Sequence, residues 1–162
     1  MDGLGRFVRA QAQPQSGLDD AIGELRDGAK RGHWIWYVFP QLAGLGMSAM
    51  AREFGLAGRD EAEAYLQHDG LRDGYARAVE AVAGRMRQPH PPRLDDLMGS
   101  RIDVLKLVSS LTLFEWVAQA AAARGGNAEM TALAERIGEV LAVAEAQGYE
   151  RCAFTLTQLT EG

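Results

Sequence analysis

Cysteine and histidine are scarce in this chain, which has one cysteine and three histidines among 162 residues. A lone Cys152 cannot form an internal disulfide, so the fold cannot depend on one and a cytoplasmic location is expected. The histidines, His33, His68 and His90, are far apart, and none has a second histidine or cysteine three or four positions away. This spacing gives no zinc-type signature, and we expect neither a metal nor a cofactor.

Long hydrophobic runs are also missing. The first residues, MDGLGRFVRAQAQP, contain an early acid and no sustained apolar stretch, so they do not resemble a secretory signal. The most apolar segment, Val104–Ala123, is interrupted by Lys106, Glu115 and Gln119. A transmembrane helix needs about 20 nearly uninterrupted apolar residues, so we expect no membrane association.

The chain has no excess of positive charge and no catalytic motif. Lys and Arg number 17 against 22 Asp and Glu, a formal net charge of −5. A general nucleic-acid binder is usually basic overall, so no nucleic-acid partner is expected. No G-x-S-x-G nucleophile motif is present, and no carboxylates stand at a spacing that implies paired acid and base roles.

What the chain does contain is apolar residues at helical spacing. These stripes predict helices over residues 18–28, 49–54, 60–67, 71–86, 102–123 and from Asn127 onward. The predicted N-terminal caps, all with short polar or acidic side chains, are Ser16 or Asp19, Ser48, Asp60 with Glu63, and Asn127. Gly28 is expected to end the first of these helices, and Gly125 with Gly126 the longest.

Two other segments break the helical pattern. The stretch RQPHPPRLDD, with three prolines around His90, is a loop, and the tail YERCAFTLTQL is the only clearly strand-like part of the chain. No repeats or linkers are present. The sequence therefore predicts an all-α fold, a single multihelical globular domain over residues 1–162. We expect roughly six to eight helices and a short extended C-terminal tail.

The block RGHWIWYVFPQLAGLG, residues 31–46, carries four aromatic residues within six positions. As a strand, it has two large apolar faces and fits burial on both sides. As a helix, it places four residues on one side: His33, Trp36, Tyr37 and Pro40. Periodicity cannot choose for so short a run. Because Pro40 disfavours helical backbone at Phe39, we favour a short buried helix or irregular segment, with most of the block in the core.

Gly44, Gly46 and Ala49 fit the G-x-G-x-x-A fingerprint of dinucleotide-binding folds. That fingerprint needs a strand directly before the glycines and a second parallel strand about 30 residues on. Here Pro40–Ala43 intervene and no second strand is visible, so a tight turn before the next helix is the simpler interpretation. Free amides at that helix start, near Ser48, can still hold an anion.

Two groups of polar residues are candidates for a ligand site. Lys30 and Arg31 precede Trp34 and Trp36, which favours a nucleotide-like pocket of cations and stacking rings; the alternative is a solvated helix end. The second group is a polar stripe on a helix otherwise built for burial. It consists of Asp103, Lys106 and Ser110, with Ser109 and Thr112 nearby. Either it lines a cavity, or Asp103 and Lys106 form an ordinary exposed ion pair.

The chain resembles a bacterial family of unknown function in four segments, RFVRAQ, AIGELRDGAKRGHWIWYVFPQLAGLGMSAMAREFGL, DEAEAYLQHDGLRDGYARAVEAV and DVLKLVSSLTLFEWVA. Members of this family often carry the label calpastatin, and one is a small mycobacterial protein. The resemblance covers about residues 4–118 and implies an all-α, multihelical fold with no established activity. The calpastatin label denotes a disordered inhibitor, whereas this chain is predicted to be globular.

The hallmark blocks of the family match here at Lys30, His33, Trp34, Trp36, Phe39, Pro40, Gln41, Gly44, Gly46, Ser48, Tyr65, Leu66, Asp103, Lys106, Ser109, Ser110, Thr112 and Phe114. The chain departs from the family at Gly32, where a serine is usual, and around Asp103. Residues after about 124 match poorly, so the resemblance implies no role for the tail.

Three functional hypotheses follow. The leading one is a cytoplasmic domain that binds a small anionic or nucleotide-like metabolite between residues 33–46 and the helix of residues 103–112. Its candidate ligand-binding residues are Lys30, Arg31, His33, Trp34, Trp36, Gln41, Gly44, Gly46, Ser48, Lys106, Ser109 and Ser110. The second is a hydrolase on a nucleotide-derived metabolite, with His33 or Asp103 as the acid–base group. The third is a protein–protein interaction module with an exposed apolar surface.

Overall fold

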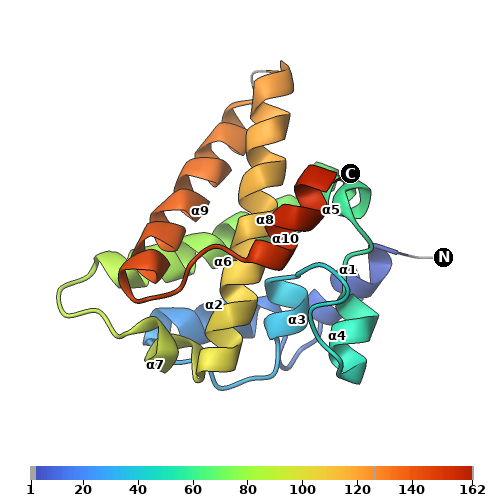
Figure 1. Cartoon of the computed structure of the whole chain (residues 1–162). Helices are drawn as coiled ribbons and strands as arrows, with labels where there is room; N and C mark the ends of the chain where they lie inside the picture. The colour runs from blue at the N-terminus through green and yellow to red at the C-terminus, as the bar shows by residue number, and fades with distance from the viewer. Residues whose placement is uncertain (1–2, 126, 162) are drawn as a thin grey trace.

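The computed structural model describes residues 3–125 and 127–161, which form an all-α single domain (Figure 1). The ten helices of these residues are α1 (Gly5–Gln11), α2 (Leu18–Asp27), α3 (Ile35–Val38), α4 (Ala49–Phe54), α5 (Arg59–Gln67), α6 (Asp69–Arg87), α7 (Leu94–Met98), α8 (Arg101–Gly125), α9 (Ala128–Ala146) and α10 (Ala153–Glu161). The all-α prediction is confirmed, but the expected count of six to eight helices was too low. The sequence pattern missed α1, α7 and α10; α1 and α7 are too short to show a helical period.

Helix α8 is the centre of the fold. Figure 1 shows α9 running beside it and α10 lying against it. Helices α5, α6 and α7 also pack against α8, with α7 at its lower, N-terminal end. By length and composition alone, α8 is the one helix in residues 3–125 and 127–161 that is apolar enough to cross a membrane. In this fold, 61% of its apolar 18-residue window is buried against other helices. Burial of this extent is what a central core helix requires.

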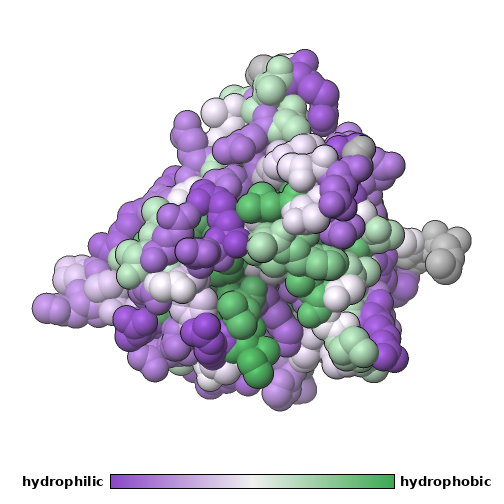
Figure 2. Space-filling model, viewed as in Figure 1, coloured by the Kyte–Doolittle hydropathy of each residue, from purple (hydrophilic) through white to green (hydrophobic). Residues whose placement is uncertain are grey.

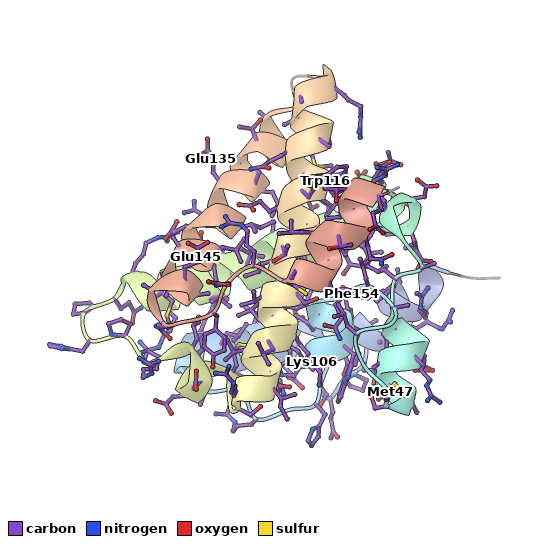
Figure 3. The ribbon with its side chains drawn as sticks, in the orientation of Figure 1. Met47, Lys106, Trp116, Glu135, Glu145 and Phe154 are labelled. Carbon is purple, nitrogen blue, oxygen red and sulfur yellow. The ribbon has the colours of Figure 1, made fainter. Side chains whose placement is uncertain are left out.

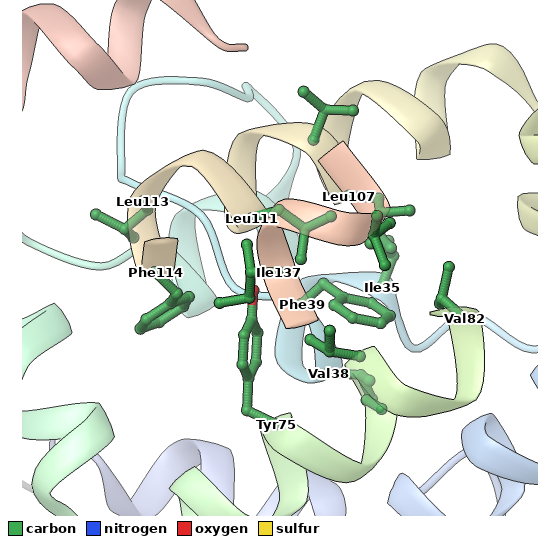
Figure 4. Close-up of a cluster of buried hydrophobic side chains, with 14 of the residues drawn as sticks. Ile35, Val38, Phe39, Tyr75, Val82, Leu107, Leu111, Leu113, Phe114 and Ile137 are labelled. Carbon is green, nitrogen blue, oxygen red and sulfur yellow. The ribbon is translucent and has the colours of Figure 1, made fainter. Parts of the chain in front are cut away.

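Aromatic rings fill the centre of the core beside α8. The ring centroids of Tyr75 and Phe114 are 4.6 Å apart, and Phe39 contacts Tyr75 edge-on at 5.9 Å (Figure 4). Burial raises the pKa of Tyr75, whose hydroxyl is 2.9 Å from the Ser110 hydroxyl. Such large rings contribute most of the apolar area that this part of the core buries.

The aromatic block of the sequence is a short buried helix, as we favoured. Helix α3 has four residues and ends at Val38, because Pro40 keeps the C-cap residue Phe39 out of helical backbone. Trp34 and Phe39 are fully buried, whereas Trp36 lies at the edge of the core. The middle of the block, residues 34–42 except Trp36, is therefore core, whereas its two ends are not buried.

The segment after α3 is held in place by backbone pairing. The isolated bridge between Leu42 and Leu56 is formed by Ala43 N–H donating to the Leu56 carbonyl (2.8 Å) and Leu56 N–H donating to the Gln41 carbonyl (2.9 Å). Gln41 thus has a fixed backbone although it lies outside any helix. The Leu42–Leu56 bridge is the sole strand-like pairing in the described chain.

The predicted helix caps are right at two places and wrong at two. The side chains of Ser48 and Asn127 accept hydrogen bonds from the first turns of α4 and α9, as predicted. Helix α2 instead begins after Gly17, and α5 after Gly58, neither with a side-chain cap. Helix α2 ends at a left-handed Gly28 and α8 ends at Gly125, as expected, while Gly126 lies outside the described residues.

The C-terminal tail is a helix, α10, and the expectation of an extended tail was wrong. The threonines and Phe154 favour strand locally, but the described chain offers no strand for them to pair with. Thr155 and Leu159, four residues apart, are both buried, so the helical face gains contact with α8. Tertiary packing decides the conformation against local propensity.

Candidate functional site

A cavity of about 330 Å³ lies between the segment after α3, the first half of α8 and the linker from α9 to α10. Its lining residues are Gln41, Leu45, Ile102, Leu105, Lys106, Val108, Ser109, Glu150 and Cys152. We call it the α8 cavity. Lys106 and Phe154 mark this face of the molecule in Figure 3. The cavity brings together the two sequence regions between which a ligand site was expected.

Packing alone does not explain why the polar side chain of Gln41 lies in the cavity wall. Its side chain is nearly buried, with 8% of the residue exposed, and it lines the α8 cavity. The side-chain amide makes no hydrogen bond with any other described residue. Its amide atoms are not among the fully enclosed unpaired polar atoms of the described residues, so they remain accessible from the cavity to water or a ligand. Gln41 is therefore a ready donor and acceptor inside the cavity.

Lys106 supplies the cation of the cavity. Its ammonium nitrogen lies 3.7 Å from Oδ1 of Asp103 and 5.1 Å from the ring centroid of Trp36. The ion pair is loose, and 22% of the lysine side chain remains exposed. The Trp36 indole N–H beside it is buried and has no hydrogen-bond partner among the described residues. The Lys106 ammonium is thus only loosely paired, and the neighbouring Trp36 indole N–H has no acceptor among the described residues.

Two hydroxyl-bearing residues connect α8 to the C-terminal segment. The Ser109 hydroxyl is 3.4 Å from that of Thr155, and the Thr112 hydroxyl accepts a hydrogen bond from Cys152 N–H at 3.1 Å. These contacts place Glu150 and Cys152 along the cavity, across from Gln41. The tail therefore completes the site, although the sequence resemblance implied no role for it.

The mouth of the cavity is apolar. Ile102 and Leu105 line it and are 64% and 48% exposed, unusually high for large aliphatic residues. Figure 2 shows apolar surface on this face of the molecule, extending downward from its centre. Ile102 and Leu105 were not predicted from the sequence, because only the polar residues of this helix were considered as candidates for a ligand site. The signal was present, since residues 102, 105, 106 and 109 share one helical face.

Lys30 and Trp34 were expected in the ligand site but serve the fold. The Lys30 ammonium is 2.9 Å from Oδ2 of Asp103 and also donates to the Gly32 carbonyl, with only 8% of its side chain exposed. Trp34 is fully buried, and its indole N–H donates to Glu24 at 2.9 Å. Both polar groups are satisfied, and Trp34 presents no exposed face on which a ligand can stack.

Arg31, His33 and Asp103 also lie outside the lining of the α8 cavity. Arg31 and His33 are exposed, and Arg31 forms a long ion pair with Asp27. Asp103 is engaged by both lysines of the chain. An acid–base group must reach its substrate, so the hydrolase hypothesis gains no support from the positions of His33 and Asp103.

Ser110, Gly44, Gly46 and Ser48 have structural explanations. Ser110 is fully buried and faces the Tyr75 hydroxyl, and Ser48 caps α4. Gly44 has φ +99°, the left-handed region that glycine alone adopts easily. A Cβ at Gly46 would lie 2.7 Å from that of Ala51. The G-x-G-x-x-A match is thus a tight turn before a helix, preceded only by the isolated Leu42–Leu56 bridge.

A second cavity, of about 310 Å³, lies between α6 and α9 but is occupied by paired charges. Its walls include Arg72 and Arg136. Arg72 contacts Glu129 at 3.0 Å, and Arg136 contacts Glu80 at 2.8 Å. These arginines already have counter-ions, which makes this cavity a weaker candidate than the one lined by Gln41 and Lys106.

The fold defines an all-α single-domain protein with a cavity beside its central helix. The chain belongs to a family described as "Protein of unknown function (DUF1810)", whose model matches residues 1–130. It is similar to the crystal structure of the conserved hypothetical protein Rv1873 from Mycobacterium tuberculosis. The TM-score is 0.77 and the identity 36%, covering 97% of this chain and 96% of that chain. No curated protein matches. The predicted bacterial family of unknown function is confirmed.

Proposed function

We propose that the protein is a cytoplasmic small-ligand-binding domain whose α8 cavity holds an anionic metabolite. The observation that carries this proposal is the side-chain amide of the nearly buried Gln41, which lines the cavity and forms no hydrogen bond with another described residue. A bound ligand would satisfy that amide, and Lys106 would neutralise its charge. Ser109 stands on the same wall and would help to orient the ligand.

The interaction-module hypothesis is less well supported. It requires an exposed apolar surface in place of a concave site. The exposed Ile102 and Leu105 belong to the lining of a cavity, and polar groups stand behind them. Apolar walls around a few polar groups are typical of small-molecule sites.

The test is a thermal-shift screen of carboxylated, phosphorylated and nucleotide metabolites against the wild type, Lys106→Met and Gln41→Leu. We expect at least one anion to raise the melting temperature of the wild type and to lose that effect in both variants. Arg52→Met is the matched control, because it removes one exposed positive charge outside the cavity lining. If no anion stabilises the wild type, or if Lys106→Met responds as Arg52→Met does, the proposal is wrong.

A further inference from the structure

We infer that the ligand of the α8 cavity is a monocarboxylate with an apolar body, not a phosphate or a nucleotide. This inference rests on the proposed function and narrows it to one chemical class. It follows from the charges, the apolar walls and the rings of the cavity, taken in turn.

The cavity holds one negative charge better than two. Lys106 is its sole cationic lining residue, and no arginine, the side chain best shaped to clamp a phosphate, is among the residues that line it. Glu150 also lines the cavity and carries a negative charge, and Asp103 is 3.7 Å from the Lys106 ammonium. Glu150 would repel a dianionic phosphate about twice as strongly as a carboxylate, and the phosphate would have no second cation in the lining. A carboxylate needs only the ammonium and the amide of Gln41.

The walls favour an alkyl or similar apolar body. Leu45, Ile102, Leu105 and Val108 line the cavity, and Ile102 and Leu105 at its mouth are the most exposed of them. An apolar ligand would cover these side chains and remove them from water. Each methylene that is fully buried increases affinity about fourfold, so affinity should increase with chain length until the ligand extends beyond the mouth.

No aromatic ring is placed to stack on a nucleobase. Trp34 is fully buried, and the Lys106 ammonium lies over the ring of Trp36. Neither tryptophan is among the residues that line the cavity. Recognition of a base depends on such stacking, which the α8 cavity does not offer.

The test measures binding of hexanoate, octanoate, octanamide, inorganic phosphate and adenosine monophosphate by titration calorimetry. We expect octanoate to bind more tightly than hexanoate and about tenfold more tightly than the neutral octanamide. Lys106→Met should remove the difference between octanoate and octanamide, whereas Arg52→Met should keep it. Circular dichroism of each variant confirms that it is folded.

The outcomes separate this inference from the proposed function. If phosphate or adenosine monophosphate binds more tightly than octanoate and depends on Lys106, the ligand class is wrong while anion binding in the cavity stands. Equal affinity for octanoate and octanamide also contradicts the inference. If none of the five probes binds, the carboxylate inference is overturned, and the broader thermal-shift screen then decides the proposed function separately.

Discussion

Glu24 organises the segment before the aromatic block, although no motif in the sequence marks it. One of its carboxylate oxygens accepts hydrogen bonds from Arg31 N–H, Gly32 N–H and the Trp34 indole, at 2.7, 2.8 and 2.9 Å. Burial opposes ionisation of Glu24, but these hydrogen bonds outweigh it and hold its pKa below the ordinary value of 4.5. The carboxylate therefore stabilises the fold when it is charged.

Glu24→Gln should lower the free energy of unfolding by about 1–2 kcal/mol at neutral pH, because it replaces charged hydrogen bonds by neutral ones. Since the folded-state pKa is below the unfolded one, the contribution is present above pH 4.5 and is lost as the pH falls below that value. Denaturant unfolding at several pH values measures both effects. Asp27→Asn, at an exposed carboxylate, is the control with almost no expected change. If the difference in the free energy of unfolding between Glu24→Gln and the wild type is the same at about pH 3 as at neutral pH, this explanation is wrong.

Ser110 is a residue for which the sequence predicted a ligand contact and the structure shows a core contact. Its hydroxyl and that of Tyr75 are 2.9 Å apart and fully enclosed. Ser110→Ala should destabilise the protein by about 1–3 kcal/mol, because the tyrosine hydroxyl is left without its partner. Adding Tyr75→Phe should recover part of that loss in a double-mutant cycle measured by denaturant unfolding. Strictly additive effects would show that the two hydroxyls do not interact.

At the scale of elements, the turn between α3 and α4 depends on glycine geometry. Gly44 has φ +99°, and a Cβ there would lie 3.3 Å from the ring of Phe154 on α10. Gly44→Ala should therefore cost about 1–2 kcal/mol of stability, measured by thermal or denaturant unfolding. Gly58→Ala is the matched control, because Gly58 is extended and a Cβ there meets nothing within 4 Å. Similar losses in both variants would contradict the assigned role of Gly44.

Elements with a long apolar period were predictable, and those decided by packing were not. The stripes of α2, α6, α8 and α9 are visible in the sequence because each buries a regular face. Helix α10 was not predictable, since its threonines favour strand and only its contact with α8 makes it helical.

The lining of the α8 cavity was likewise predictable only in part. Gln41, Lys106 and Ser109 were expected there, whereas Glu150 and Cys152 belong to a linker that only the fold brings alongside α8.

At the scale of the whole molecule, α9 should be required for folding although the family match ends at residue 130. Its buried residues, Met130, Leu133, Ala134, Ile137, Val140, Leu141 and Ala144, cover α8 and α6. A chain truncated after Gly125 would expose the facing side chains and should lose cooperative unfolding. Near-ultraviolet circular dichroism and thermal melting measure this loss, with truncation after Thr160 as the control. A cooperative melt of the shorter chain would contradict the central role assigned to α8 and α9.

The location of the ligand site is the central claim, and an amide-resolved NMR titration with octanoate tests it most directly. We predict that the largest chemical-shift changes fall on the residues around the α8 cavity, in the segment 41–46, in α8 between Ile102 and Ser109, and at Glu150–Cys152. Lys106→Met should reduce them. Shifts centred on the cavity between α6 and α9, or no shifts at all at millimolar octanoate, would contradict the claim.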